Sequence, residues 1–220
     1  NTNMLFQVIN AFLIMNETTR ISNHSCIGVS SGCIAQVIFQ SAVSWDHLVI
    51  KNIKINLDSN DGALLVFDSS LYIFDSMLIN FEGSGNMNGF LITSYANVTI
   101  NNTSFYNISP FCFFLTFSIF EFHRSNIRQE KKSISSYPFS ASAIHICNPS
   151  GECKVFASRF ENLLVSEDGA ALKIQTESNQ NSAVIYIFDC LFKKNYAAFS
   201  GGAISIIKTK IVLSESNFLE

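Results

Sequence analysis

The sequence contains few charged residues, few prolines and a single tryptophan. Charged residues make up 14% of the 220 residues, three residues are proline, and 48% are hydrophobic. A chain with this much apolar surface and so little charge is not typical of a disordered protein. The net charge of −3 leaves no excess of basic residues for a positively charged stripe, so no nucleic-acid partner is predicted.

Long apolar runs are also missing. The longest, Phe111 to Phe120, is too short to cross a bilayer as a helix and is interrupted by Thr116 and Ser118. We therefore predict no membrane segment in this piece, and we recognise no signal peptide. The chain starts at Asn1 without a methionine and stops in mid-motif at Glu220. We interpret it as a fragment of a larger protein.

The six cysteines include two pairs that are close in sequence. The pairs consist of Cys26 with Cys33, and Cys147 with Cys153. Neither spacing is CxxC and no paired histidines accompany them, so local disulfides are favoured over a metal site. We interpret Cys112 and Cys190 as buried free thiols or as a long-range bridge.

Six N-glycosylation sequons are present. They start at Asn16, Asn23, Asn97, Asn101, Asn102 and Asn107. Four of them crowd between residues 97 and 109, which together with the cysteines favours a secreted eukaryotic glycoprotein at the cell surface or outside the cell. Strand alternation there places Asn97 and Asn101 outward on one face, where glycans would shield it. The alternative is unmodified asparagine in polar turns.

From Leu48 onward, two sequence marks alternate. The first is a small residue followed by an apolar strand, and it occurs at Gly62, Gly89, Ser142, Gly169 and Gly202. The second is a small residue two positions before a large apolar one, and it occurs at Ser76, Thr103, Ser158, Cys190 and Ser216. Gly62 precedes Ser76 by fourteen residues, and Gly202 precedes Ser216 by the same distance. A glycine repeated before a strand indicates a bend where a Cβ would crowd or φ is positive.

The gap between Gly89 and Ser142 predicts a hidden copy of the repeat. Counting fourteen residues back from Ser125 leads to residues 111–114, a degenerate copy without glycine. At the other end, Asn52 is taken as the earliest second mark, although the polar Lys54 occupies its apolar position.

A period of about 20–35 residues with short strands predicts a β-solenoid. Helical repeats are disfavoured because the apolar residues alternate with a period of two, as in residues 98–100 and 185–187. We expect an all-β parallel β-helix of seven or eight coils over residues 48–220, with a longer loop at 124–141. Residues 1–47 are expected to form an irregular N-terminal segment or a cap with the first coil.

Two motifs near the C-terminus resemble a known family. Gly201-Gly202-Ala203-Ile204 and Phe192-Lys193-Lys194-Asn195 look like the GGA(I/L/V) and FxxN repeats of polymorphic outer-membrane-protein-type adhesins. More broadly, they resemble pectin-lyase-like proteins, including large surface proteins of eukaryotic microbes. The resemblance covers roughly residues 48–220 and implies a right-handed parallel β-helix, a fold that hosts enzymes, adhesins and structural proteins alike.

Carboxylates offer the strongest candidates for chemistry. Asp189 and Glu215 each precede a second mark and lie one coil apart, which predicts a separation of about 5 Å. Asp75 shares their register but lies several coils away, too far to act with Asp189 as a glycosidase pair. Asp58 and Asp61 are expected in a turn. No third group joins any of these, so no catalytic, cofactor-binding or metal-binding residue is assigned.

These observations favour a non-enzymatic extracellular glycoprotein that serves as structural or adhesive surface material. Self-association by end-to-end stacking would be easy for such a solenoid. The alternatives are a polysaccharide-degrading β-helix enzyme, either a lyase or a glycoside hydrolase, and a glycan-binding module. Two or three carboxylates with a basic residue in one groove would favour the enzyme, whereas an exposed aromatic ladder would favour the binding module.

Overall fold

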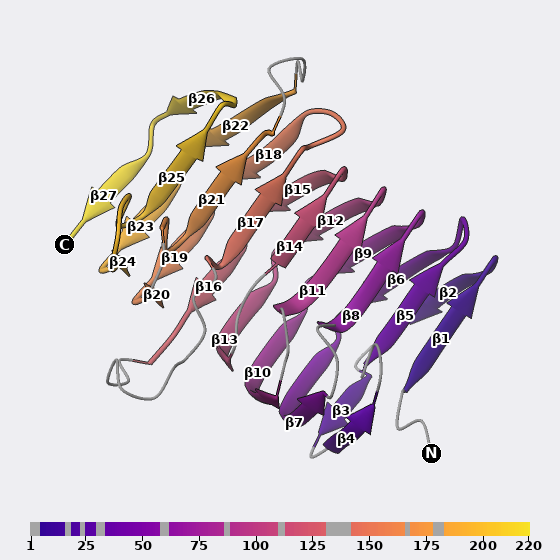
Figure 1. Cartoon of the computed structure of the whole chain (residues 1–220). Helices are drawn as coiled ribbons and strands as arrows, with labels where there is room; N and C mark the ends of the chain where they lie inside the picture. The colour runs from indigo at the N-terminus through magenta and orange to yellow at the C-terminus, as the bar shows by residue number, and fades with distance from the viewer. Residues whose placement is uncertain are drawn as a thin grey trace.

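The computed structural model of the chain is a parallel β-solenoid of about six turns (Figure 1). It describes residues 5–15, 19–22, 25–29, 34–57, 62–85, 89–109, 113–130, 142–165, 168–177 and 183–220. Within these residues the regular structure is all strand, without helix. The two termini lie at opposite ends of the stack (Figure 1). The predicted fold class is therefore confirmed, with slightly fewer turns than the seven or eight expected.

The first sheet contains eight parallel strands that follow one another along the solenoid axis. They are β1 (Phe6–Ile9), β5 (Ala35–Ile38), β8 (Gly62–Phe67), β11 (Gly89–Ser94), β14 (Phe113–Thr116), β17 (Ile144–Cys147), β21 (Leu172–Gln175) and β25 (Ile204–Ile207). The first and last of them belong to the end turns, each of which has a neighbour on one side only.

The second sheet also contains eight strands, each one corner further along the chain. They are β2 (Phe12–Met15), β6 (Ala42–Asp46), β9 (Ser70–Phe74), β12 (Asn97–Asn101), β15 (Ile119–His123), β18 (Cys153–Phe156), β22 (Val184–Phe188) and β26 (Lys210–Ser214). The segment before Leu48 thus already supplies strands in register with the later coils, because β5 pairs with β8 and β6 with β9.

The third sheet contains nine strands. They are β3 (Arg20–Ser22), β4 (Ser25–Val29), β7 (Val49–Leu57), β10 (Met77–Gly85), β13 (Ser104–Ser109), β16 (Asn126–Arg128), β19 (Arg159–Glu161), β23 (Leu191–Lys193) and β27 (Asn217–Leu219). Both β3 and β4 pair with β7. A fourth, two-stranded sheet joins β20 (Leu164–Val165) to β24 (Tyr196–Ala197).

Alternating side chains fill the interior of the solenoid. In many strands, such as β9, β12 and β22, every second residue is buried and apolar, which suits a pleated, half-buried surface. One inward row of the third sheet ends with Phe160, Phe192 and Phe218, whose rings stack at centroid distances of 5.1 and 4.8 Å. Full burial of a ring such as Phe160 or Phe192 is worth about 1.5–3 kcal/mol, so the core is built from many similar contributions along the axis.

A ladder of small residues follows the corner between the second and third sheets, as predicted. Its members are Ser76, Thr103, Ser125, Ser158, Cys190 and Ser216. Ser125 Oγ accepts the backbone N–H of Thr103 at 3.1 Å and donates to the carbonyl of His123 at 2.6 Å. Each hydroxyl therefore joins its own corner to the preceding coil and satisfies a buried amide.

A second small-residue ladder follows the corner between the first and second sheets. Ser69 Oγ accepts the N–H of Ser41 at 3.2 Å, and Ser118 Oγ accepts the N–H of Ala96 at the same distance. Sequence reasoning missed this ladder. Its signal is a constant offset, because each member stands seven residues before a position of the predicted ladder or of its first coil.

The structure corrects the register at two points. The partner of Ser76 in the preceding coil is Leu48, not Asn52, because Met77 pairs with Val49. In the glycine row, the position of Gly202 is held by Ala170 in the preceding coil, while Gly169 lies level with Gly201. The hidden copy is confirmed where it is described, since β14 pairs with both β11 and β17.

Candidate functional site

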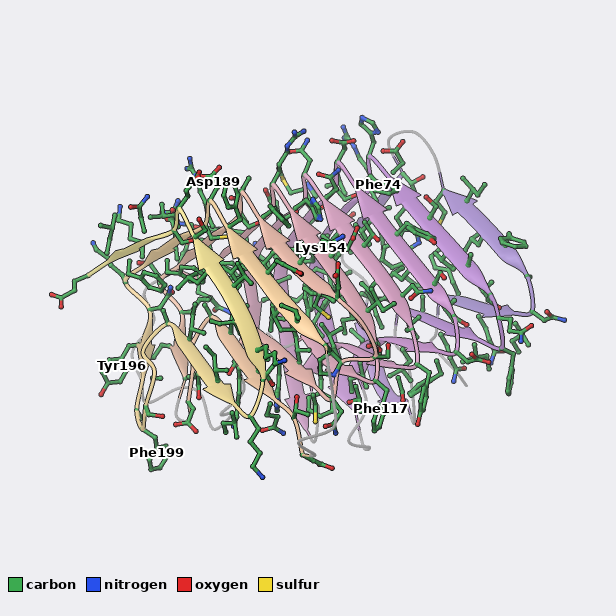
Figure 2. The ribbon with its side chains drawn as sticks, turned by 90° about the horizontal axis from the view of Figure 1, so that it is seen from above. Phe74, Phe117, Lys154, Asp189, Tyr196 and Phe199 are labelled. Atoms are coloured by element: carbon green, nitrogen blue, oxygen red, sulfur yellow. The ribbon has the colours of Figure 1, made fainter. Side chains whose placement is uncertain are left out.

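A row of exposed residues precedes the small-residue ladder at the corner between the second and third sheets. The members of this corner row are His47, Asp75, Asn102, Arg124, Ala157, Asp189 and Glu215, one from each successive coil. All have positive φ angles between 46° and 55°. Asparagine and aspartate tolerate this left-handed conformation better than other residues with a Cβ, which accounts for several of them in the row. Asp189 marks the row in Figure 2.

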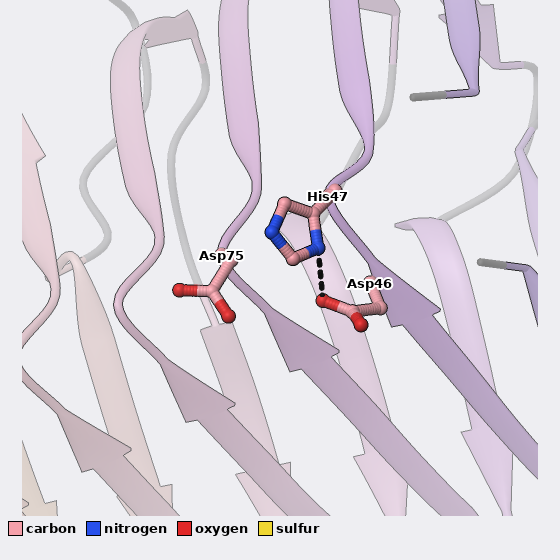
Figure 3. Close-up of side chains that lie close together, drawn as sticks. All are labelled: Asp46, His47 and Asp75. Carbon is pink, nitrogen blue, oxygen red and sulfur yellow. Dashed lines mark ion pairs between the residues drawn. The ribbon is translucent and has the colours of Figure 1, made fainter. Parts of the chain in front are cut away.

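Three ionisable side chains meet at the start of the corner row (Figure 3). Asp46 ends β6 on the outer face of the second sheet, and His47 follows it at the corner. Asp75 occupies the same corner position one coil further on. One potential ligand atom from each residue lies within 4.8 Å of the others. The stacking of coils, rather than any sequence motif, brings Asp75 to the other two.

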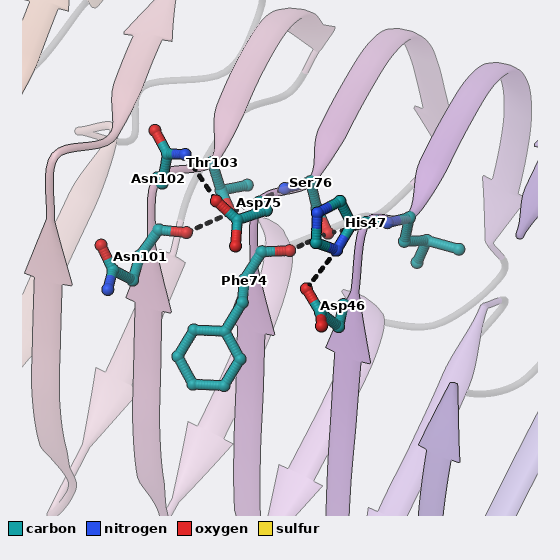
Figure 4. A network of polar contacts seen from close by, with 9 residues as sticks. Asp46, His47, Phe74, Asp75, Ser76, Asn101, Asn102 and Thr103 are labelled. Carbon is teal, nitrogen blue, oxygen red and sulfur yellow. Dashed lines mark hydrogen bonds and ion pairs between the residues drawn. The ribbon is translucent and has the colours of Figure 1, made fainter. Parts of the chain in front are cut away.

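Hydrogen bonds fix the backbone and side chains of this cluster (Figure 4). The backbone N–H of His47 donates to the carbonyl of Phe74 at 3.2 Å, and that of Asp75 donates to Asn101 at 3.1 Å. Asn102 Nδ2 donates to Asp75 Oδ1 at 2.5 Å. His47 Nδ1 lies 2.7 Å from Asp46 Oδ1. The Asp75 carboxylate is thus oriented by its neighbour in the next coil.

The outer face of the second sheet carries partly buried aromatic rings, of which Phe74 is labelled in Figure 2. Tyr72 and Phe74 stack with ring centroids 6.3 Å apart. Further along, the ring of Phe156 lies 5.3 Å from His123 and 5.8 Å from Phe188. Strand pairing lines up these last three residues at one position of successive coils. This face offers a discontinuous aromatic row with polar residues around it.

A charged cluster lies on the same face. Lys154 Nζ lies 3.2 Å from Glu121 Oε1, and His123 Nε2 lies 3.8 Å from Glu121 Oε2. Burial lowers the pKa of His123, although the Glu121 carboxylate opposes the shift. The imidazole is therefore mainly neutral at pH 7 and able to accept a proton. With one carboxylate, the cluster does not form the pair that glycoside hydrolysis commonly uses.

The predicted carboxylate pair lies where the register places it. Asp189 and Glu215 occupy adjacent coils of the corner row, and the backbone N–H of Asp189 donates to Ser214. Within the part of the chain that the structure describes, no cation joins either carboxylate in an ion pair. Asp58 and Asp61 lie outside the described residues.

The predicted glycosylation residues occupy different environments. Asn97 is exposed and Asn101 half-buried on the outer face of the second sheet. Asn102 is exposed and bonded to Asp75. Asn107 belongs to an asparagine ladder, because its Nδ2 donates to Asn80 Oδ1 at 3.4 Å while its Oδ1 accepts the N–H of Glu130 at 2.8 Å. The first two sequons, starting at residues 16 and 23, lie outside the described residues.

The disulfide predicted between Cys147 and Cys153 is wrong, because both thiols are free and buried. Cys147 ends a strand of the first sheet, and its Sγ lies 3.5 Å from Gln175 Nε2 in the next coil. Cys153 begins a strand of the second sheet and is fully buried in the core. The turn between them therefore places the two cysteines in different sheets. Cys190 is a buried free thiol, as one of its two interpretations predicts.

The other predicted disulfide stays a prediction. Cys33 lies outside the described residues, as does Cys112, and the structure describes only the backbone of Cys26. Burial raises the pKa of both Cys153 and Cys190 to about 11. These thiols are thus protonated at neutral pH and function as small core residues rather than as nucleophiles.

Comparison with known proteins leaves the chain unassigned to a family. No protein-family model matches it, and no curated protein does. Within the described residues, no helix is both long and apolar enough to span a membrane.

Proposed function

We propose that this chain is a non-enzymatic β-solenoid glycoprotein that serves as structural or adhesive material outside the cell or at its surface. The small-residue ladder carries this proposal. Its hydrogen bonds join five pairs of adjacent coils, for example Thr103 to Ser125 and Ser125 to Ser158. Polar groups at this corner are thereby committed to linking coils, which suits a long, mechanically uniform scaffold.

Exposed sequon asparagines support placement on the secretory route. Asn97 points outward with no polar partner among the described residues, so a glycan there would disturb no contact. The half-exposed Phe218 at the final strand, stacked on Phe192, marks a surface that another coil would cover. That coil could belong to the same chain or to a second copy stacked end to end. We also infer that the repeats are of the pectin-lyase-like, polymorphic outer-membrane-protein-like kind.

Secretion from eukaryotic cells with an added leader tests the glycoprotein proposal. The intact mass should fall after enzymatic removal of N-glycans, and peptide mapping should find a glycan at Asn97. The Asn97→Gln variant is the control, and it should lack the corresponding mass. An unchanged mass for the secreted wild-type chain would refute the proposal that the protein is glycosylated.

Adhesion and catalysis need separate measurements. Beads coated with the secreted chain should bind to cells or aggregate with one another, and uncoated beads should not. A panel of polysaccharides incubated with the chain should release no new reducing ends or unsaturated products. Product release that is lost in the Glu121→Gln variant would favour the enzyme instead, because Glu121 and His123 then supply the acid–base chemistry.

Glycan binding is a second candidate function, favoured by the aromatic row of the second sheet. Sugar rings stack on exposed aromatic faces, and Phe156 lies between His123 and Phe188 with polar groups close by. In a glycan-array experiment, Phe156→Ser should lose binding that the wild type shows. Phe114→Ser on the outer face of the first sheet is the matched control and should keep it. If the wild type binds no glycan, this candidate fails and the scaffold proposal remains.

A further inference from the structure

We propose that Asp46, His47 and Asp75 form a binding site for a divalent transition-metal ion that joins two successive coils. Asp46 and His47 belong to one coil and Asp75 to the next. An ion held by all three would therefore act as a clip across the corner between the second and third sheets.

The spacing of the donor atoms suits a single ion. Transition-metal ions bind imidazole nitrogen and carboxylate oxygen at about 2.0–2.2 Å, so two donors on opposite sides lie about 4 Å apart. Donor atoms of the three residues already lie within 4.8 Å of one another. His47 and Asp75 are exposed at the surface, so small rotations of their side chains would bring all three donors to one centre.

The surroundings of one Asp46 oxygen also support the site. The Asp46 side chain is 37% exposed as a whole, but its Oδ1 atom is shielded from water within the described part of the chain. Its polar contact there is the ion pair with His47 Nδ1 at 2.7 Å. A carboxylate oxygen that is removed from water is costly unless a cation or a hydrogen-bond donor compensates it. A metal ion would meet this need more completely than one imidazole edge.

The donor set selects the class of ion. Carboxylates alone suit Ca²⁺ and Mg²⁺, whereas an imidazole favours Zn²⁺ and neighbouring transition metals. Asn102 supports the site from outside, because its hydrogen bond to Asp75 Oδ1 orients that carboxylate. With three protein ligands at an exposed corner, water would complete the coordination shell.

A second histidine and carboxylate on the same sheet make an internal comparison. His123 and Glu121 also lie close together, but Lys154 Nζ is 3.2 Å from the Glu121 carboxylate. A fixed positive charge beside that carboxylate opposes a divalent cation. The corner at Asp75 has no ion pair with lysine or arginine among the residues that the structure describes. The proposed site is therefore distinct in charge from the other histidine cluster.

Titration of the tag-free chain with ZnCl₂ in a calorimeter tests the proposal. We expect one saturable ion per chain, and affinity reduced by about tenfold or more in His47→Asn and in Asp75→Asn. Asparagine tolerates the left-handed backbone at both positions, so these variants should fold. Circular dichroism checks this. The matched controls His123→Asn and Asp189→Asn should bind Zn²⁺ like the wild type.

Co²⁺ provides a spectroscopic measurement of the same site. Its visible absorption should change on binding to the wild type and should not change with Asp75→Asn. Any of three results would overturn the proposal. They are no saturable Zn²⁺ binding at millimolar concentration, equal affinity in wild type and Asp75→Asn, and binding of Ca²⁺ with no binding of Zn²⁺.

Discussion

Replacing Ser125 by alanine removes one rung of the small-residue ladder without changing the strands beside it. Ser125 is fully buried, and its Oγ accepts the N–H of Thr103 at 3.1 Å. The substitution leaves that amide buried without a partner. The carbonyl of His123 keeps a hydrogen bond from Asn102, so its loss is smaller.

The expected destabilisation follows from these contacts. An unsatisfied buried amide costs about 1–3 kcal/mol, so we expect Ser125→Ala to lower the free energy of unfolding by about 2 kcal/mol. For a chain of this size, that lowers the Tm by about 4–8 °C. Urea and thermal unfolding measure both quantities, and hydrogen exchange should show faster exchange of the Thr103 amide.

Two matched variants separate the ladder from a general effect of removing a hydroxyl. Ser125→Cys should cost less than Ser125→Ala, because Cys190 holds the equivalent rung and its Sγ contacts the carbonyl of Phe188 at 3.3 Å. Ser44→Ala on the outer face of β6 should change stability by less than about 0.5 kcal/mol. Equal stability of Ser125→Ala and wild type would refute the ladder as a source of stability.

Three further predictions concern glycines, thiols and asparagines. Gly201→Ala should lower the free energy of unfolding by at least about 1–2 kcal/mol, because φ is +60° and a Cβ would lie 2.3 Å from Ile204 O. Gly202→Ala should be nearly neutral, and urea unfolding measures both variants. Folding raises the pKa of Cys153 and Cys190 from 9.0 to about 11, so this contribution to stability is full below pH 9 and is lost as pH rises through 11. Unfolding measured across that range should depend less on pH in the Cys153→Ala and Cys190→Ala variants, and an unchanged slope would contradict the shifts. Asn107→Gln should lower the free energy of unfolding by about 1 kcal/mol, because it loses the ladder contacts and glutamine tolerates the left-handed backbone less well. Asn97→Gln should leave the free energy of unfolding unchanged. Equal stability of the two variants would count against the asparagine ladder.

Much of the fold could be predicted because each coil contains its own copy of the repeat within a short stretch of sequence. A strand of alternating apolar residues, a corner and a small residue recur at similar spacing, so Ser76, Thr103 and Ser125 identify one another without any knowledge of the structure. The hidden copy in the coil of β14 was found in the same way, since its distance to Ser125 keeps the common value although the glycine is missing. The second ladder was equally accessible through its seven-residue offset.

The register was harder to predict where the repeat is irregular, at its first coil and beside loops of unusual length. Asn52 shares a residue type with turn positions but belongs to an asparagine ladder inside the third sheet, where Asn80 Nδ2 donates to its Oδ1. Gly169 and Gly202 look equivalent in sequence, yet loop length shifts them by one position. The geometry of the loop, and not the presence of glycine, decides which residue needs a positive φ. Gly201 and Gly169 meet that condition.

The solenoid class, the apolar interior and the small-residue ladder can be predicted from the amino-acid sequence, because they depend on periodicity within one coil. Which polar side chains become neighbours depends on how the coils stack. Asp46, His47 and Asp75 form no sequence motif. Asp75 lies one complete coil after the other two, and strand pairing places it beside them. Cys147 and Cys153 are close in sequence but do not pair, because the corner between them places them in different sheets. Contacts between coils depend on the length of each turn. The local sequence pattern does not predict which residues a turn of a given length brings together.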